Sequence, residues 1–299
     1  MKINISVNKK IITTAVLPLI LGLLTACQAV PQAAISSATS AAPQYLLLGE
    51  VHDHAAGHQA RLAVIRQQLA TNQPTALILE QFDTDQQTAL DEAQRVCSTA
   101  DCLLQKLRKP GLQWQWPLYQ PLIQLALDQK IPMIAGNLSR EQARRVMKEG
   151  YGAVFDAATL KRWQLRDNGA SNSPTDLQPH QTVLQMQQQE VIQAHCGQLP
   201  LSMAEGMAKA QMARDIVMAD KLLQQPGRSI LIAGNGHVRK DIGVAYWLRF
   251  AGAKPAYSHV YAESAIDAVA ADAQTQISKQ ARPDPCAGLI INSKPKETP

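Results

Sequence analysis

The chain has 299 residues with 29 basic and 24 acidic side chains, a formal net charge of +5. This excess does not indicate nucleic-acid binding, because no stripe of lysines and arginines with interleaved aromatic residues appears. Three of the lysines lie in residues 1–26, which hold no acid. A chain cleaved there keeps 26 basic against 24 acidic side chains, a net charge of only +2.

The N-terminus has the features of a targeting segment. A basic start precedes an apolar stretch over 11–24, which is shorter than the roughly 18 apolar residues of a membrane span. The stretch ends in Leu-Thr-Ala-Cys at Cys27, which resembles a bacterial lipobox. We therefore predict a lipoprotein signal peptide over 1–26 and lipidation of Cys27; an ordinary signal peptide or a membrane anchor is the alternative. Gln28 in place of Asp favours the outer membrane, so we expect a lipid-anchored protein of the bacterial cell envelope, facing the periplasm or the surface.

The rest of the chain divides by composition into a tether, one domain and a tail. Residues 28–43 are mostly Ala, Ser, Gln, Pro and Thr and cannot bury a core, so we expect the lipidated cysteine and a flexible tether over 27–43. The stretch 44–290 is long enough for a single sizeable domain, and a disordered polar tail is expected over 291–299.

Short apolar runs alternate with helical patterns in this domain, which predicts an α/β fold with a parallel sheet wrapped by helices. The first run, at 46–48, is continuous rather than alternating, as expected for a strand buried on both faces. Strands are predicted at Tyr45–Leu48, Thr75–Leu79, Ile131–Ala135 and Ser229–Ala233, with a weaker edge piece near Ala256–Tyr261. Helices are predicted at Ala60–Ala70, Thr84–Val96, Pro121–Lys130, from a capping box of Ser139 and Gln142 to Glu149, and at Ser202–Gln225, with a polar loop over 167–180.

Two Gly-x-x-His elements, at 49–52 and 234–237, each follow a predicted strand. In open α/β sheets, ligands bind outside the carboxyl ends of the strands. Polar residues occupy four such ends: Glu50 with His52, Glu80, Asn137 and His237. We therefore expect them to converge on one site. The second element lacks the third glycine of a dinucleotide fingerprint, so a loop that presents His237 is the preferred interpretation.

Three histidines follow the first strand. Gly49 frees the backbone for a tight turn, and Asp53 is expected to cap the next helix. His54 and His58 lie four residues apart and would share a helix face. With His52 they could ligate a transition metal, hold a propionate or shuttle protons; the alternative is that some of them cap the helix or lie in solvent.

The other candidate residues lie further along the chain. Glu80 ends a buried strand and needs a partner, which is a metal, an imidazolium or an arginine. Arg214 could reach an anionic ligand, or form a structural ion pair with Glu80, or lie on a solvated helix face. The aromatic segment 114–119 either packs in the core or lines an apolar pocket for a flat ligand.

Four cysteines remain besides Cys27, and an even number in an oxidising compartment suggests two disulfides. Four cysteines allow three pairings. The pairing of Cys97 with Cys102 and of Cys196 with Cys286 is preferred, because the first two are close in sequence. Metal ligation is the weaker alternative, since no Cys-x-x-Cys pair occurs.

Together these motifs resemble those of the ChaN family of haem-binding lipoproteins, within the Tiki and erythromycin-esterase-like superfamily. The matching segments are 49–53 with His58, 79–83 with Gln87, 114–119, 211–215 and 234–244. They cover nearly the whole domain in the expected order. One departure is Ala245-Tyr246, where the family tends to place proline, which affects the geometry of the loop more than His237 itself.

The resemblance implies a three-layer α/β/α domain around a small, mainly parallel central sheet, and a role in haem or iron uptake. It also implies that two chains can form a homodimer with two haems stacked between them. In that arrangement tyrosine holds the iron, while histidine and lysine of the partner chain hold the propionates. Tyr119 is the first candidate for the tyrosine and Tyr151 the second.

Our leading hypothesis is an envelope lipoprotein that binds haem in a cleft over the strand ends. The expected cofactor-binding residues are His52, His58, His237, Tyr119 and Arg214. The alternative is a metal-dependent peptidase or esterase, in which Zn²⁺, Mn²⁺ or Fe²⁺ is held by a cluster that would also be catalytic: Glu50, His52, Glu80 and His237. A third hypothesis is a non-catalytic binding module of the envelope.

Overall fold

The structure, a computed structural model, describes residues 43–71, 75–107, 114–166, 180–265, 270–284 and 286–287. All of them belong to one compact unit. The predicted signal peptide, Cys27, the tether, the tail and most of the predicted loop lie outside the described residues. Among the helices that are described, none is long and apolar enough to cross a membrane.

A six-stranded sheet forms the centre of the domain, and every neighbouring pair of strands is parallel. The strand order is β3-β2-β4-β1-β5-β6. The strands are β1 (Tyr45–Leu48), β2 (Thr75–Asp83), β3 (Met133–Asn137), β4 (Arg228–Ile232), β5 (Ala256–Ala262) and β6 (Ala273–Gln276). The predicted α/β class with a mainly parallel sheet is confirmed.

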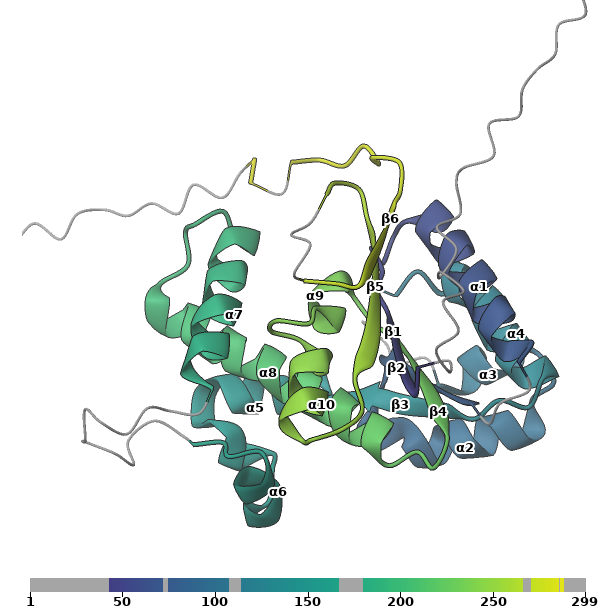
Figure 1. The fold of residues 1–299 in the computed structure, drawn as a ribbon, viewed down its shortest axis with the longest axis horizontal. Coiled ribbons are helices and arrows are strands. Elements are labelled where there is room, and N and C mark those ends of the chain that lie inside the picture. Colours follow the sequence, from purple (N-terminus) through teal and green to yellow (C-terminus); the bar gives the residue numbers. More distant parts are fainter. Residues whose placement is uncertain are drawn as a thin grey trace, which may run out of the picture. The chain divides into compact units, whose positions relative to one another are not determined.

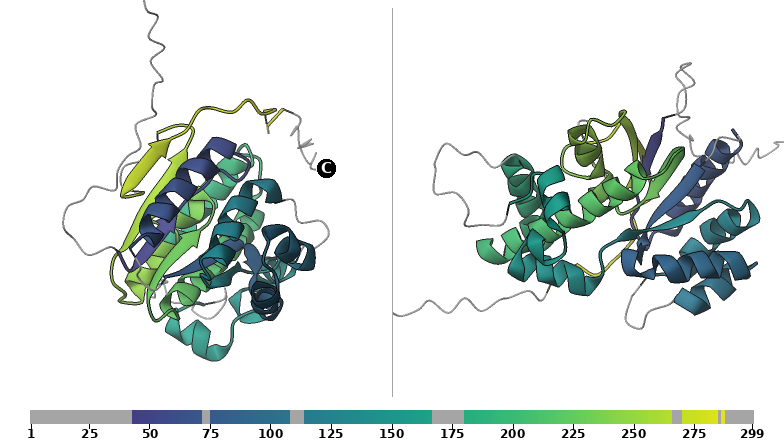
Figure 2. Two further views of the ribbon diagram at one scale, coloured as in Figure 1. Left: turned by 90° about the vertical axis from the view of Figure 1, so that its right-hand side faces the viewer. Right: turned by 90° about the horizontal axis from the view of Figure 1, so that it is seen from below.

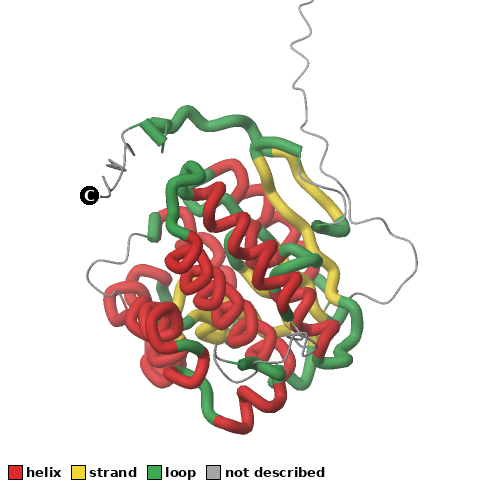
Figure 3. Tube along the Cα trace, turned by 90° about the vertical axis from the view of Figure 1, so that its left-hand side faces the viewer, coloured by secondary structure: helices red, strands yellow, loops and turns green. Residues whose placement is uncertain are grey.

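Helices cover both faces of this sheet (Figure 1 and Figure 2). One side carries α1 (Ala55–Leu69), α2 (Gln87–Val96), α3 (Ala100–Leu107) and α4 (Trp116–Asp128). The opposite side carries α5 (Arg140–Glu149), α6 (Ala157–Arg162), α7 (Gln181–Ala194), α8 (Leu201–Leu223) and α10 (Val244–Phe250), and the short α9 (Asn235–Val238) follows β4. Figure 3, viewed from the side of α7 and α8, shows this layer of helices in front of the strands.

Two apolar cores lie between these layers, one on each face of the sheet. Leu46 and Leu48 of β1 belong to the core under α1–α4, whereas Leu47 belongs to the core under α5, α8 and α10. All three leucines are fully buried. Burial on both faces explains why this strand is a continuous apolar run, since neither face of the sheet meets water.

Several boundaries differ from those predicted, each for a local reason. The helix α1 begins at Ala55 rather than Ala60, because the His54 side chain caps it by accepting a hydrogen bond from Gly57 N at 3.0 Å. The predicted capping role of Asp53 is therefore wrong. The helix α4 begins at Trp116 rather than Pro121, since a proline is tolerated in the first turn and Pro117 stands there.

Two strand predictions were also wrong. The strand β2 continues past Leu79 to Asp83 through an irregularity in its pairing with β3, so Glu80 lies within a strand rather than at its end. The predicted edge piece is β5, which is an internal strand between β1 and β6. The sequence of β6, Ala-Gln-Thr-Gln, is polar and only partly buried, which explains why the edge strand was missed.

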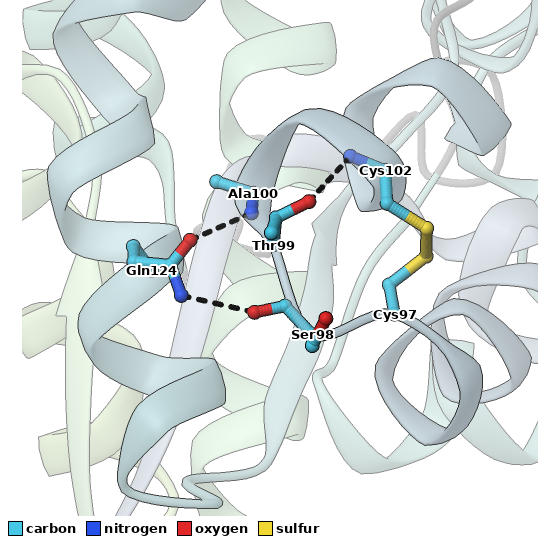
Figure 4. The surroundings of a disulfide bond; sticks show 6 residues. All are labelled: Cys97, Ser98, Thr99, Ala100, Cys102 and Gln124. Atoms are coloured by element: carbon cyan, nitrogen blue, oxygen red, sulfur yellow. Dashed lines mark hydrogen bonds between the residues drawn. A yellow bond between two sulfur atoms is a disulfide. The ribbon is translucent and has the colours of Figure 1, made fainter.

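Both preferred disulfides form, Cys97–Cys102 and Cys196–Cys286. The first closes the connection between α2 and α3 (Figure 4). The side chain of Gln124 on α4 fastens the same connection, because it donates to Ser98 O at 3.1 Å and accepts from Ala100 N at 2.9 Å.

The second disulfide anchors a C-terminal strap, which we define as residues 277–287 without residue 285, which is not described. The links that hold the strap include the hydrogen bond of 2.7 Å from His54 Nε2 to Ser278 O, the ion pair of 2.7 Å between Arg282 and Asp53, and the disulfide Cys196–Cys286. Two of these links reach the turn between β1 and α1. The strap therefore braces the segment that carries His52.

Candidate functional site

The carboxyl ends of β1, β2 and β4 bring the predicted polar residues together. Glu50 and His52 follow β1, Glu80 lies in the last part of β2, and His237 lies in α9 directly after β4. His237 Nε2 is 3.6 Å from Glu80 Oε1, and a Cβ added to Gly234 would lie 3.0 Å from His52 Nε2. The expected convergence of the two Gly-x-x-His elements is thus present, and it needs glycine at position 234 for the close approach.

Glu50 is the best-connected side chain of the site, although it is almost fully buried. Its Oε1 accepts hydrogen bonds from His52 Nδ1 at 2.7 Å, from Gln81 Nε2 at 3.1 Å and from the Tyr119 hydroxyl. Its Oε2 forms an ion pair with the buried Arg61 of α1. Both oxygens are therefore occupied, and Glu50 orients His52 rather than facing a ligand.

His58 joins the same network through hydrogen bonds to Arg61 and to the backbone of His52. Its Nδ1 accepts from Arg61 Nη2 at 3.0 Å, so the ring proton is on Nε2, which donates to the carbonyl of His52 at 3.0 Å. Burial lowers the pKa of His58 and favours this neutral form. The ring packs edge-on against Tyr119, with ring centroids 4.7 Å apart. In this structure His58 holds the backbone at His52 and both of its nitrogens are used.

His237 lies between two carboxylates. Its Nδ1 donates to Asp215 Oδ1 at 2.6 Å, and its Nε2 faces Glu80. Burial disfavours the imidazolium, but the charges of Asp215 and Glu80 outweigh this effect and raise the pKa of His237. Gln187 of α7 donates to the second oxygen of Asp215 at 3.2 Å and fixes that carboxylate.

Glu80 obtains its partners from the neighbouring strand end. Its Oε2 accepts from Gly234 N at 2.7 Å. Burial raises the pKa of Glu80, but the charges of His237 and His52 and this hydrogen bond bring it below its usual value. The predicted alternative of an ion pair with Arg214 is not formed within 4 Å in the described part of the chain, although the two charges interact at longer range.

A cavity of 260 Å³ opens beside these residues. It is lined by His52, Glu80, Asp83, Trp114, Asn137, Leu138, Arg140 and Arg214. The side chain of His52 is 45% exposed here, and burial lowers the pKa of its imidazole. The Trp114 ring stands edge-on to His52 with centroids 4.9 Å apart, so the aromatic segment contributes one wall of the cavity and is not core alone.

The two tyrosines considered as iron ligands are both buried. The Tyr119 hydroxyl donates to Glu50, and burial raises the pKa of this phenol. The Tyr151 hydroxyl contacts Met212 Sδ at 3.5 Å in the core under α5 and α8. Neither phenol lines the cavity.

The described residues include no group of three or more His, Cys, Asp or Glu side chains placed to hold a metal ion. Of the four predicted ligands, Glu50 is engaged by four donors and does not line the cavity, so it is not placed to share a metal with the others. The metal-dependent hydrolase is therefore not favoured.

Arg61, Gln81 and Gln187 were missed by sequence reasoning. Arg61 stands three residues after His58 on a helix face that also carries Leu62 and Ile65, and all three side chains are buried. An arginine in an apolar stripe, one turn from a candidate histidine, was a readable signal of a buried ion pair. Gln81 and Gln187 gave no such signal, since glutamine is frequent throughout this chain.

Replacing Arg61 by methionine should destabilise the protein strongly. The change leaves the buried Glu50 carboxylate without its cation, which typically costs about 3–5 kcal/mol. Urea unfolding at neutral pH measures the loss of free energy. Arg66→Met is the matched control, because Arg66 is exposed on the same helix and should change stability by less than about 0.5 kcal/mol. Equal losses for both variants would contradict the role given to the ion pair.

Replacing Asp215 by asparagine should lower the pKa of His237, because it removes a carboxylate that directly contacts the imidazole. NMR titration of the imidazole Cε1–H resonance measures the change. Because folding raises this pKa above its usual 6.5, the proton on His237 stabilises the fold fully below pH 6.5, and this contribution is lost as pH rises through the folded-state pKa. Glu205→Gln, a charge change on the same helix away from the site, should leave the titration unchanged; an unchanged titration in Asp215→Asn would refute the assignment.

The family of haem-binding uptake proteins of the Tiki superfamily, ChaN, matches residues 37–248. None of the curated proteins matches the chain significantly in sequence. ChaN of Campylobacter jejuni, solved for its cofacial haem binding, is 19% identical with a TM-score of 0.62, over 77% of this chain and 86% of that chain.

Two further solved structures are similar at a lower level. A mutant of the erythromycin esterase EreC in its open conformation is 13% identical over 74% of this chain and 70% of that chain, with a TM-score of 0.40. RRSP, a MARTX toxin effector domain from Vibrio vulnificus, is 12% identical over 69% of this chain and 32% of that chain, with a TM-score of 0.37. Such low scores say nothing about the site. The family match spans well over half of the sequence, and the chain belongs to the ChaN family of haem-binding uptake proteins in the Tiki superfamily.

Proposed function

We propose that this chain is an envelope lipoprotein that binds haem at the cavity beside His52. The observation that carries the proposal is the state of the His52 imidazole. Glu50 holds its Nδ1, its Nε2 has no hydrogen-bond partner in the described part of the chain, and the side chain is 45% exposed. Burial lowers its pKa and thereby favours the neutral form, which is the form that ligates iron.

The residues around His52 fit a flat, anionic, iron-containing molecule. Trp114 supplies an aromatic wall, and Arg140 and Arg214 supply positive charge in the same cavity. A carboxylate on the far nitrogen of a ligating histidine fixes its tautomer and raises its basicity, and Glu50 stands in that position. Haem would contribute the iron and its redox chemistry; the protein contributes the imidazole, the aromatic wall and the charge.

The cavity is too small to enclose a whole haem. Its volume of 260 Å³ is below the roughly 300–1,000 Å³ of pockets that bury a whole small molecule. The cavity would therefore cover only part of the haem, and the remaining surface of the macrocycle would need another cover. In Campylobacter ChaN the haem binding is cofacial, and we propose that two copies of this chain likewise form a homodimer around two haems.

Haemin added to the purified protein should give a saturable shift of the Soret band. The variant His52→Ala should bind more weakly by at least about tenfold and show an altered Soret position, because the iron loses its imidazole. His195→Ala is the control, since His195 lies at the end of α7 and does not line the cavity.

The proposal of haem binding fails if the spectrum matches free haemin at every ratio. Light scattering during the same titration tests the dimer separately. A mass that stays at one chain at saturation would remove the homodimer and leave haem binding standing.

The envelope anchor depends on Cys27, which lies outside the described residues. The full chain expressed in a bacterium should be recovered with the membrane fraction, with a lipid mass on Cys27, and Cys27→Ala should be released or remain unprocessed. Fractionation and mass spectrometry of the N-terminal peptide measure both. An unmodified Cys27 in wild-type protein would rule out the anchor.

A further inference from the structure

The lining of the cavity includes two arginines without acceptors. Arg214, on α8, has a fully buried Nε with no hydrogen-bond partner among the described residues. Arg140, the first residue of α5, is exposed, and in the described part of the chain it forms no ion pair with any carboxylate. A buried N–H that gives up water without gaining an acceptor costs free energy. The geometry therefore shows a place where an acceptor is missing.

The lining also includes a side-chain oxygen, Asn137 Oδ1, that accepts no hydrogen bond from the described residues. Asn137, at the end of β3, is 6% exposed, and its Nδ2 donates to Glu80 O at 3.0 Å. That bond fixes which way the amide faces and leaves Oδ1 buried without a partner. Asn137 and Arg214 line the cavity together. Two guanidinium groups and one amide with an unpaired oxygen thus line one cavity.

The acidic side chains that line this cavity have other partners than the two arginines. Glu80 is occupied by Gly234 N and His237, and Asp83 has an interaction of its own. The guanidinium fork matches the two oxygens of a carboxylate, which it can bind through two parallel hydrogen bonds. The free oxygen of Asn137 would accept from the hydroxyl of a protonated carboxyl group or from a bridging water.

We propose that Arg214, Arg140 and Asn137 form a carboxylate-binding subsite that draws a propionate of the ligand into the cavity. This inference rests on the proposed haem binding and adds an orientation to it: the carboxylate edge of the porphyrin faces the protein. His52 and Trp114 line the same cavity, so a propionate of a haem bound at His52 would enter beside the imidazole and the aromatic wall.

A purely structural role for Arg214 is the competing explanation. In that case Arg214 only offsets the negative charge of Glu80 and Asp215, with which it interacts at long range. The two roles differ in one measurable property. A structural arginine affects stability alone, whereas a subsite discriminates between ligands that differ only in their carboxylates.

The test compares haemin with haemin dimethyl ester, which has the same ring and iron but no free carboxylate. The wild-type protein should bind haemin roughly 10–100-fold more tightly than the ester, as expected for a charged hydrogen bond. Arg214→Gln should weaken haemin binding by a similar factor and remove the preference. Arg144→Gln removes an exposed charge from the same helix as Arg140, away from the cavity, and should change neither affinity.

A second ligand separates the subsite from iron ligation. Iron-free protoporphyrin IX keeps both propionates, so its binding, followed by tryptophan fluorescence, should be weakened by Arg214→Gln and left unchanged by His52→Ala. Glutarate, a small dicarboxylate, should compete with haemin and not with the ester. Competition by inorganic phosphate without competition by glutarate would overturn the carboxylate assignment.

The two proposals fail in different ways. Equal affinity of the wild-type protein for haemin and its ester overturns the subsite and leaves haem binding intact. Failure of the wild-type protein to bind either ligand overturns haem binding, and the subsite with it. The comparison of acid with ester uses the wild-type protein, so it decides the question even where Arg214→Gln does not fold.

Discussion

The buried ion pair between Glu50 and Arg61 is the constraint on which the arrangement of the site depends. It joins the end of β1 to the middle of α1, and both side chains are almost fully buried. A charge in such a place is tolerated only when it is paired and its remaining hydrogen-bonding capacity is satisfied. Glu50 meets this condition with donors from His52, Gln81 and Tyr119. The position of His52 is thus set by its hydrogen bond to the buried Glu50 carboxylate.

In both Gly-x-x-His elements the histidine is held by a buried acid, yet the pKa values of the two histidines shift in opposite directions. Each histidine turns Nδ1 toward a buried acid, Glu50 for His52 and Asp215 for His237. His237 also faces a second carboxylate, Glu80, and its pKa is raised, whereas the pKa of the half-exposed His52 is lowered by burial. One imidazole is therefore suited to donate electrons to a metal, and the other to stay cationic and neutralise the acids beneath it.

The class of fold, the places of five of the six described strands and the convergence of the polar strand ends could be predicted from sequence, because apolar runs and the glycines that follow them are local signals. The carboxyl-end rule then placed Glu50, Glu80 and His237 together without any knowledge of side-chain contacts. The direction in which each side chain points could not be predicted. Whether Tyr119 faces a ligand or a buried carboxylate depends on how α4 packs against α1, and that depends on contacts between segments remote in sequence. The polar edge strand β6 was missed for a related reason, since its pairing with β5 rather than its composition makes it a strand.

The disulfide Cys196–Cys286 at the end of the C-terminal strap makes the fold depend on the redox state of the compartment. Cys196 and Cys286 are 90 residues apart, and a crosslink over such a distance restricts the unfolded chain far more than the short loop of Cys97–Cys102 does. Where thiols are kept reduced, only Arg282, His54 and neighbouring backbone contacts would secure the last segment beside the first turn of the domain. Oxidation closes residues 196–286 into a ring that includes α8 and the strands β4, β5 and β6, so formation of this disulfide completes the maturation of the protein after folding.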